Sequence, residues 1–191
     1  PASAAAIYED LAGRSNQLAD RIHHLLRAAG GYLKCEVGRA RELLSEIEER
    51  VPDDARMLAM FAELARAEGD PSEEVRRLRQ LAQATHSKEV RLNALRRAAE
   101  LSGDQELLRM VVLTDPEDLE ARLALASMAS ESGDVAGAVS QYEHIARTHK
   151  GTPAAAALYR AAQLRWAVNH DATGAIEFLG EALEEVAHAG T

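Results

Sequence analysis

The sequence predicts an all-α protein made of two-helix units that stack one after another. A turn signal recurs at Gly69-Asp70, Gly103-Asp104 and Gly133-Asp134, with a degenerate version at His170-Asp171. Apolar residues between these signals repeat with helical spacing. Runs of β-branched residues are short, so strands have little to be made from. The signals begin at residues 69, 103, 133 and 170, and a period of 30 to 37 residues indicates a repeat protein.

Each turn signal is expected to end one helix and to begin the next. Glycine accepts the left-handed conformation that follows a helix, and the Asp carboxylate accepts hydrogen bonds from the free N–H groups of the following helix start. The segment 70–73, Asp-Pro-Ser-Glu, adds Pro at the first helical position and a carboxylate three residues after the cap. This is therefore the best marked helix boundary in the chain.

The helices between the turns each have one apolar face, as in Leu58, Phe61, Ala62 and Ala65. A unit of about 34 residues cannot cover that face alone, so neighbouring units must stack and share a core. We expect one cooperative repeat domain over residues 1–191, and no Met at position 1 suggests a piece of a longer protein. Residues 2–12 have the pattern of only the second helix of a unit. The expected units are 2–20 (partial), 21–54, 55–88, 89–118, 119–153 and 154–188.

Composition narrows the function classes. With 191 residues, 47% of them hydrophobic, the chain is long enough to bury a core without metals or disulfides, and its low aromatic content of 4% favours closely packed helices. The net charge of −9 argues against nucleic-acid binding. Cys35, the single cysteine, has no partner for a disulfide or a metal. No apolar stretch is long enough for a membrane span and no leader is present, so a cytoplasmic location is the default expectation.

These units resemble the tetratricopeptide repeat (TPR) family in a degenerate form. The unit from Leu119 fits best, through Leu125-Ala126, Ala129, Gly133-Asp134, Ala138, Tyr142 and Ile145. The unit 55–88 fits through Leu58, Phe61, Ala62 and Gly69-Asp70 but has Glu74 where the family prefers Ala. The resemblance implies a right-handed α-α superhelix, a solenoid of about five to six helical hairpins. Between Asp104 and Pro116 the second helix is expected to be about one turn short.

Reactive groups show no catalytic pattern. The sequence has no phosphate-binding Gly loop, no HExxH pair and no nucleophile elbow, which predicts no enzyme activity, no cofactor and no metal site. His23 and His24 are about 100° apart on a helix, which is poor ligand geometry. His144 and His149 are expected to be partly exposed near a helix end. A hydrolase would need a pocket with clustered His and carboxylate side chains.

The resemblance also implies a concave groove, lined by the first helix of each unit. It places sixteen residues there: His23, Arg27, Gly30, Arg56, Met60, Glu63, Arg66, Asn93, Arg97, Glu100, Ser127, Glu131, Tyr159, Arg160, Gln163 and Trp166. One hypothesis is a locally basic groove that takes an acidic or C-terminal peptide, because Arg offers a planar fork to carboxylates. The alternative is that these arginines pair with Glu63, Glu100 and neighbouring helices. Trp166 and Tyr159 either anchor a ligand side chain or pack against the last helix.

The leading functional prediction is a protein–protein interaction scaffold, with a protein or peptide partner. The alternative is a regulatory or sensor module of a larger signalling or transcription protein. Ala-, Arg- and Glu-rich usage suggests a bacterial source. The Lys and Asn set with which family members clamp chaperone tails is not reproduced. Uncovered end helices of repeat arrays often pair, which makes a homo-oligomer a further hypothesis.

Overall fold

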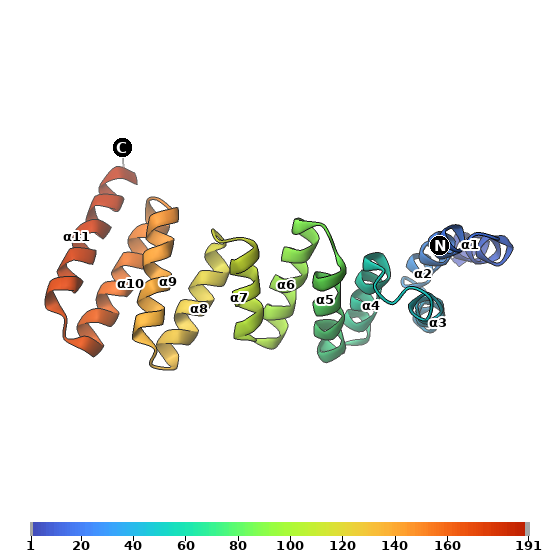
Figure 1. The fold of residues 1–191 in the computed structure, drawn as a ribbon, viewed down its shortest axis with the longest axis horizontal. Helices are drawn as coiled ribbons and strands as arrows, with labels where there is room; N and C mark the ends of the chain where they lie inside the picture. Colours follow the sequence, from blue (N-terminus) through green and yellow to red (C-terminus); the bar gives the residue numbers. More distant parts are fainter. Residues whose placement is uncertain (1, 190–191) are drawn as a thin grey trace. The chain divides into compact units, whose positions relative to one another are not determined.

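The computed structural model describes residues 2–189, which form eleven α-helices and, within that range, no strand (Figure 1). This confirms the predicted all-α class. The helices are α1 (Ala2–Arg14), α2 (Leu18–Tyr32), α3 (Val37–Glu48), α4 (Ala55–Glu68), α5 (Pro71–Ala84), α6 (Lys88–Ser102), α7 (Gln105–Thr114), α8 (Leu119–Glu131), α9 (Val135–Thr148), α10 (Thr152–Asn169) and α11 (Ala172–Ala189).

The chain divides into two compact units, residues 1–103 and residues 104–191. In the first unit, each helix from α1 to α6 packs against the next one in sequence, and α2 also contacts α4. In the second unit, the same holds from α7 to α11. Helix α7, with 10 residues, is the short helix that the sequence predicts between Asp104 and Pro116.

Four turns between consecutive helices have the predicted capping chemistry. Gly69, Gly103 and Gly133 have φ angles of 71°, 63° and 82°, and His170 takes the same left-handed conformation with a φ of 51°. The Asp that follows each of these residues accepts a hydrogen bond from a backbone N–H of the next helix. These four turn signals therefore mark the ends of α4, α6, α8 and α10, including the turn that lacks glycine.

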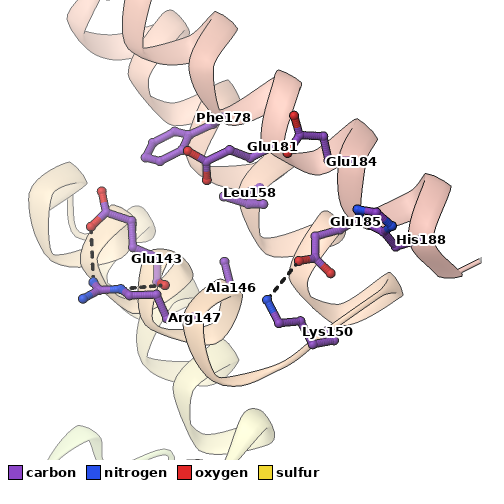
Figure 2. Close-up of a pocket in the computed structure, with 10 residues that line it drawn as sticks. All are labelled: Glu143, Ala146, Arg147, Lys150, Leu158, Phe178, Glu181, Glu184, Glu185 and His188. Atoms are coloured by element: carbon purple, nitrogen blue, oxygen red, sulfur yellow. Dashed lines mark hydrogen bonds and ion pairs between the residues drawn. The ribbon is translucent and has the colours of Figure 1, made fainter.

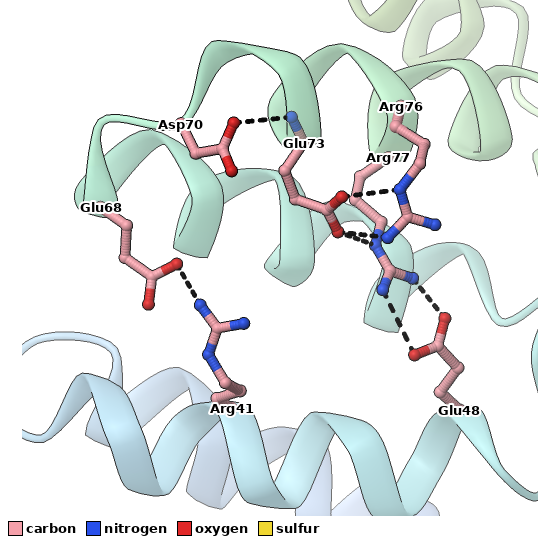
Figure 3. Close-up of polar contacts among 7 residues, drawn as sticks. All are labelled: Arg41, Glu48, Glu68, Asp70, Glu73, Arg76 and Arg77. Carbon is pink, nitrogen blue, oxygen red and sulfur yellow. Dashed lines mark hydrogen bonds and ion pairs between the residues drawn. The ribbon is translucent and has the colours of Figure 1, made fainter.

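Glu73 departs from the expected role of a capping carboxylate. Asp70 caps α5 by accepting from the N–H of Glu73 at 3.0 Å, but the Glu73 side chain turns toward Arg76 and Arg77 (Figure 3). The N–H of Asp70 instead donates to the carbonyl of Ala65 at 2.9 Å. Two guanidinium groups on the same helix hold the carboxylate more strongly than one neutral N–H would.

Both units have cores of aliphatic side chains between closely spaced helices. In the first unit the largest fully buried side chains are Leu44, Ile47, Met57, Leu58, Leu64 and Leu95. In the second unit a cluster of alanines, with Val139, Tyr142 and Ile145, fills the space between α8, α9 and α10. Alanine lets these helices approach closely, as expected from the composition. Within residues 2–189, no helix is both long and apolar enough to cross a membrane.

Candidate partner-binding surfaces

The first unit contains a pocket of about 240 Å³ between α4, α5 and α6. Apolar side chains line it, and polar groups at its edge come from Glu63 and Arg66 in α4 and from Asn93 and Arg97 in α6. These four residues are groove positions that the sequence predicts. The fold thus brings together residues about 30 positions apart, because α4 and α6 are both packed on α5.

Glu74 of α5 joins the two arginines of this pocket. Its Oε1 accepts from Nε and Nη2 of Arg66 at 2.9 and 2.8 Å, and from Nε of Arg97 at 3.0 Å. Glu74 is only 2% exposed. Burial on its own would raise the pKa of Glu74, but the hydrogen bonds from Arg97 and Arg66 outweigh it and hold the pKa below the ordinary value. The carboxylate is therefore charged at neutral pH.

The other predicted groove residues of the first unit lie apart from this pocket. Arg56 binds Asp54, whose carboxylate caps α4, with 2.7 Å between Nη2 and Oδ2. Arg27 lies over the ring of Tyr8, 5.3 Å from its centre. Met60 is half-buried, and its terminal methyl lies close to Gly30. Arg97 also donates to Glu100 at 2.9 Å, so the arginines of this unit have partners within the chain, as the alternative interpretation expects.

The second unit has an apolar pocket of about 470 Å³ between α10 and α11. Tyr159 and Trp166 of α10 line one side, and Ile176 and Leu179 of α11 line the other. Tyr159 is 50% exposed and Trp166 is 58% exposed. Trp166 therefore neighbours the last helix without being buried by it, and its indole remains accessible to a ligand.

A neighbouring pocket of about 400 Å³ is more polar and lies against α8. It contains the predicted residues Ser127, Glu131, Arg160 and Gln163. Ser127 donates to Glu131 at 3.1 Å, and Arg160 donates to Gln163 at 3.2 Å. These predicted residues thus form hydrogen bonds with one another within each helix.

Another pocket of the second unit, about 640 Å³, is lined by α9, α10 and α11 and was not predicted from the sequence (Figure 2). Glu185 of α11 accepts from the N–H of Gly151 at 2.8 Å and from Nζ of Lys150 at 3.2 Å. The hydrogen bond from Gly151, followed by that from Lys150, lowers the pKa of Glu185. The acidic run 181–185 was the available signal, but a run of this kind normally indicates a solvated helix face.

His23 and His24 lie in α2 of the first unit, and His144 lies in α9 of the second. Among the described residues, no group of three or more His, Cys, Asp or Glu side chains is placed to hold a metal ion. The ring of His24 stacks on Tyr8 at 6.2 Å, and His23 meets His24 edge-on. His144 is half-buried, which agrees with the expected partial exposure, and its Nε2 is buried without a hydrogen-bond partner. Burial, together with the charge of Arg122, lowers the pKa of His144, so it does not supply a positive charge to the helix end at neutral pH.

Comparison with solved structures identifies the architecture. The crystal structure of YrrB, a TPR protein with an unusual peptide-binding site, superimposes with a TM-score of 0.50 and 17% identity over 87% of this chain and 90% of that chain. The structure has the TPR-like helical repeat fold. The crystal structure of the MamA protein gives a TM-score of 0.50 and 14% identity over 98% of this chain and 94% of that chain. No protein-family model matches the sequence, and no curated protein matches it. At these identities the likeness concerns the fold alone.

Proposed function

We propose that the chain is a protein–protein interaction scaffold that binds a segment of another protein at the pocket between α4, α5 and α6. The observation that carries this proposal is the Arg66–Glu74–Arg97 arrangement beside an apolar pocket. A buried carboxylate fixes two guanidinium groups at the edge of a pocket, which reduces the entropy lost when a ligand binds them. TPR-like neighbours are consistent with a scaffold.

The partner segment that fits this pocket is an acidic peptide with an apolar side chain. Arg66 contacts Glu74 through Nε and Nη2, which leaves Nη1 for a ligand, and its side chain is 54% exposed. The apolar side chain would fill the pocket above Leu78 and Ala94. Glu63, exposed beside the same pocket, would repel an acidic ligand only weakly, because it is solvated.

A selection from a random peptide library displayed on phage, with the full chain as bait, tests this proposal. The selected peptides are expected to carry Asp or Glu beside a large apolar residue. Asn93→Asp adds a negative charge at the pocket without disturbing the Glu74 contacts. It should weaken binding of the selected peptide about fivefold, because a like charge at a partly exposed site costs up to about 1 kcal/mol.

Asn16→Asp is the matched control, because Asn16 is exposed in the turn between α1 and α2. It should leave the affinity unchanged. A selection that yields basic peptides, or a selected peptide that binds the Asn93→Asp chain as tightly as the wild type, would reject the proposal.

A further inference from the structure

The last helix carries an exposed apolar stripe. Ile176, Leu179, Leu183 and Val186 are spaced three, four and three residues apart, which places them on one face of α11. Their exposed fractions are 68%, 39%, 72% and 58%. The stripe borders the pocket that Tyr159 and Trp166 of α10 line from the other side. Such a concentration of large exposed apolar side chains marks an interaction surface.

The preceding hairpin shows what covers the corresponding surface within this chain. Asp171 accepts from the N–H of Gly174 as Asp134 accepts from that of Gly137, so α11 corresponds to α9 at a shift of 37 positions. Ile176 then corresponds to Val139, and Leu179 to Tyr142. Val139 and Tyr142 are only 7% and 8% exposed.

Side chains of α10, the first helix of the next hairpin, join those of α8 in burying this surface of α9. Ala157 and Ala161 belong to the same buried cluster as Val139 and Tyr142, and Leu164 packs against that cluster. These α10 residues recur at helical spacing on one face. The α10–α11 surface therefore continues an interface already present in the chain, and the ligand that fits it is one amphipathic helix with small residues and leucine on its apolar face.

The charge of α11 indicates which kind of helix fits its apolar stripe. Between Ala172 and Ala189, α11 contains four glutamates and no Lys or Arg. Glu177 and Glu184 each follow a stripe residue and border the stripe on one side. Two copies of α11 laid together would bring like charges into contact, whereas a basic helix would be complementary. Helix α10, which carries Arg160 and Arg165 and no acidic residue, has the required composition.

We propose that the face formed by Ile176, Leu179, Leu183, Tyr159 and Trp166 binds one amphipathic α-helix of another protein, with small residues and leucine on its apolar face and basic residues beside it. This site is separate from the pocket between α4, α5 and α6. The chain would thus have one binding surface for an acidic segment and one for a basic helix.

The probe for this proposal is a fluorescently labelled peptide with the sequence of residues 152–169, titrated with the full chain and followed by anisotropy. Ile176→Glu together with Leu183→Glu should weaken its binding at least about tenfold, because both are large apolar side chains of the proposed face that a bound helix would cover. Val168→Glu, at a residue of α10 that is 55% exposed and outside the pocket, is the matched control and should leave binding unchanged. Circular dichroism verifies that each variant is folded.

A peptide with Arg160→Glu and Arg165→Glu should bind more weakly, and the difference should shrink at high salt. Absence of binding, or binding unaffected by the double substitution, would overturn the proposal. A concentration-dependent dimer in sedimentation velocity would also overturn the proposal if Ile176→Glu together with Leu183→Glu abolished it. The face would then bind a second copy of the chain. The Asn93→Asp chain should bind this peptide normally, which separates a failure here from a failure of the proposed function.

Discussion

The guanidinium carbon of Arg77 lies 4.0 Å from the centre of the Phe61 ring, so that α5 contacts α4 through a cation–π interaction. The same guanidinium donates from Nε to Glu73 at 2.7 Å and from both terminal nitrogens to Glu48 of α3 (Figure 3). The Arg77 side chain is 7% exposed. A single buried cation therefore connects three consecutive helices of the first unit.

Arg77→Ala should destabilise the chain by about 3 kcal/mol, because it removes the buried member of an ion pair, leaves Glu48 without its Arg77 partner and removes the packing on Phe61. Arg76→Ala is the matched control. Arg76 binds the same Glu73, but its side chain is 52% exposed, and its removal should cost less than about 0.5 kcal/mol. Urea unfolding followed by circular dichroism measures both. Equal losses in the two variants would show that burial of Arg77 does not determine its contribution.

Glu74→Ala should destabilise the chain by about 1 to 3 kcal/mol, because it removes charge-assisted hydrogen bonds to Arg66 and Arg97 from a buried position. Glu100→Ala removes an exposed carboxylate that binds Arg97, and it should change stability by less than about 0.5 kcal/mol. The two variants are compared by urea unfolding. An unfolding free energy of Glu74→Ala equal to that of the wild type would mean that the contacts of Glu74 with Arg66 and Arg97 do not stabilise the chain.

The lowered pKa of Glu74 determines how its contribution to the unfolding free energy changes at acidic pH. Its stabilisation is complete above its unfolded-state pKa, which is near the ordinary value of 4.5, and is lost as the pH falls through the lower folded-state pKa. The difference in unfolding free energy between wild type and Glu74→Ala should therefore be constant from pH 7 to about pH 5 and shrink at lower pH. A difference that grows on acidification would contradict the cited contacts.

The lowered pKa of His144 affects the stability of the chain at a higher pH than the lowered pKa of Glu74 does. The folded chain binds this proton more weakly than the unfolded chain does, so stability is complete above the ordinary value of 6.5 and falls as the pH drops below it. His144→Leu should reduce the decrease in melting temperature between pH 7 and about pH 5. His149→Leu, at the end of the same helix, is the control, and an identical decrease in His144→Leu and wild type would exclude this origin.

His170 occupies a left-handed position that glycine occupies in the three equivalent turns. His170→Gly should therefore stabilise the chain by about 0.5 to 1 kcal/mol, because glycine avoids the clash of Cβ in that conformation. Gly133→Ala, with a φ of 82°, should have the opposite effect, of about 1 kcal/mol. Thermal unfolding compares the two. A lower melting temperature for His170→Gly would mean that its side chain stabilises the turn.

The sequence was sufficient for the fold because the signals are local. Gly-Asp pairs determine helix ends through left-handed geometry and capping, and apolar periodicity determines which face is buried. Even the short α7 follows from the distance between Asp104 and Pro116. Glu73 was expected to help cap α5, but its side chain binds Arg76 and Arg77 instead. A carboxylate near a cap can also pair with an arginine three or four residues later.

The candidate sites were predictable only in part. The TPR resemblance implied that Arg66, Asn93 and Arg97 line a common groove, and they lie at one pocket, but it could not show that Glu74, from the second helix of the unit, would bind both arginines. The pocket around Glu185 depends on a contact between Gly151 and a residue 34 positions later. Contacts of that range depend on how helices pack, and sequence spacing does not determine side-chain direction across them.

Amide hydrogen exchange of the full chain, with and without the selected acidic peptide, tests the scaffold proposal most directly. Bound peptide should slow exchange in α4 to α6 and leave α10 and α11 unchanged, because the peptide contacts only the pocket between α4, α5 and α6. Protection confined to other helices, or no protection at a peptide concentration that saturates binding, would contradict it.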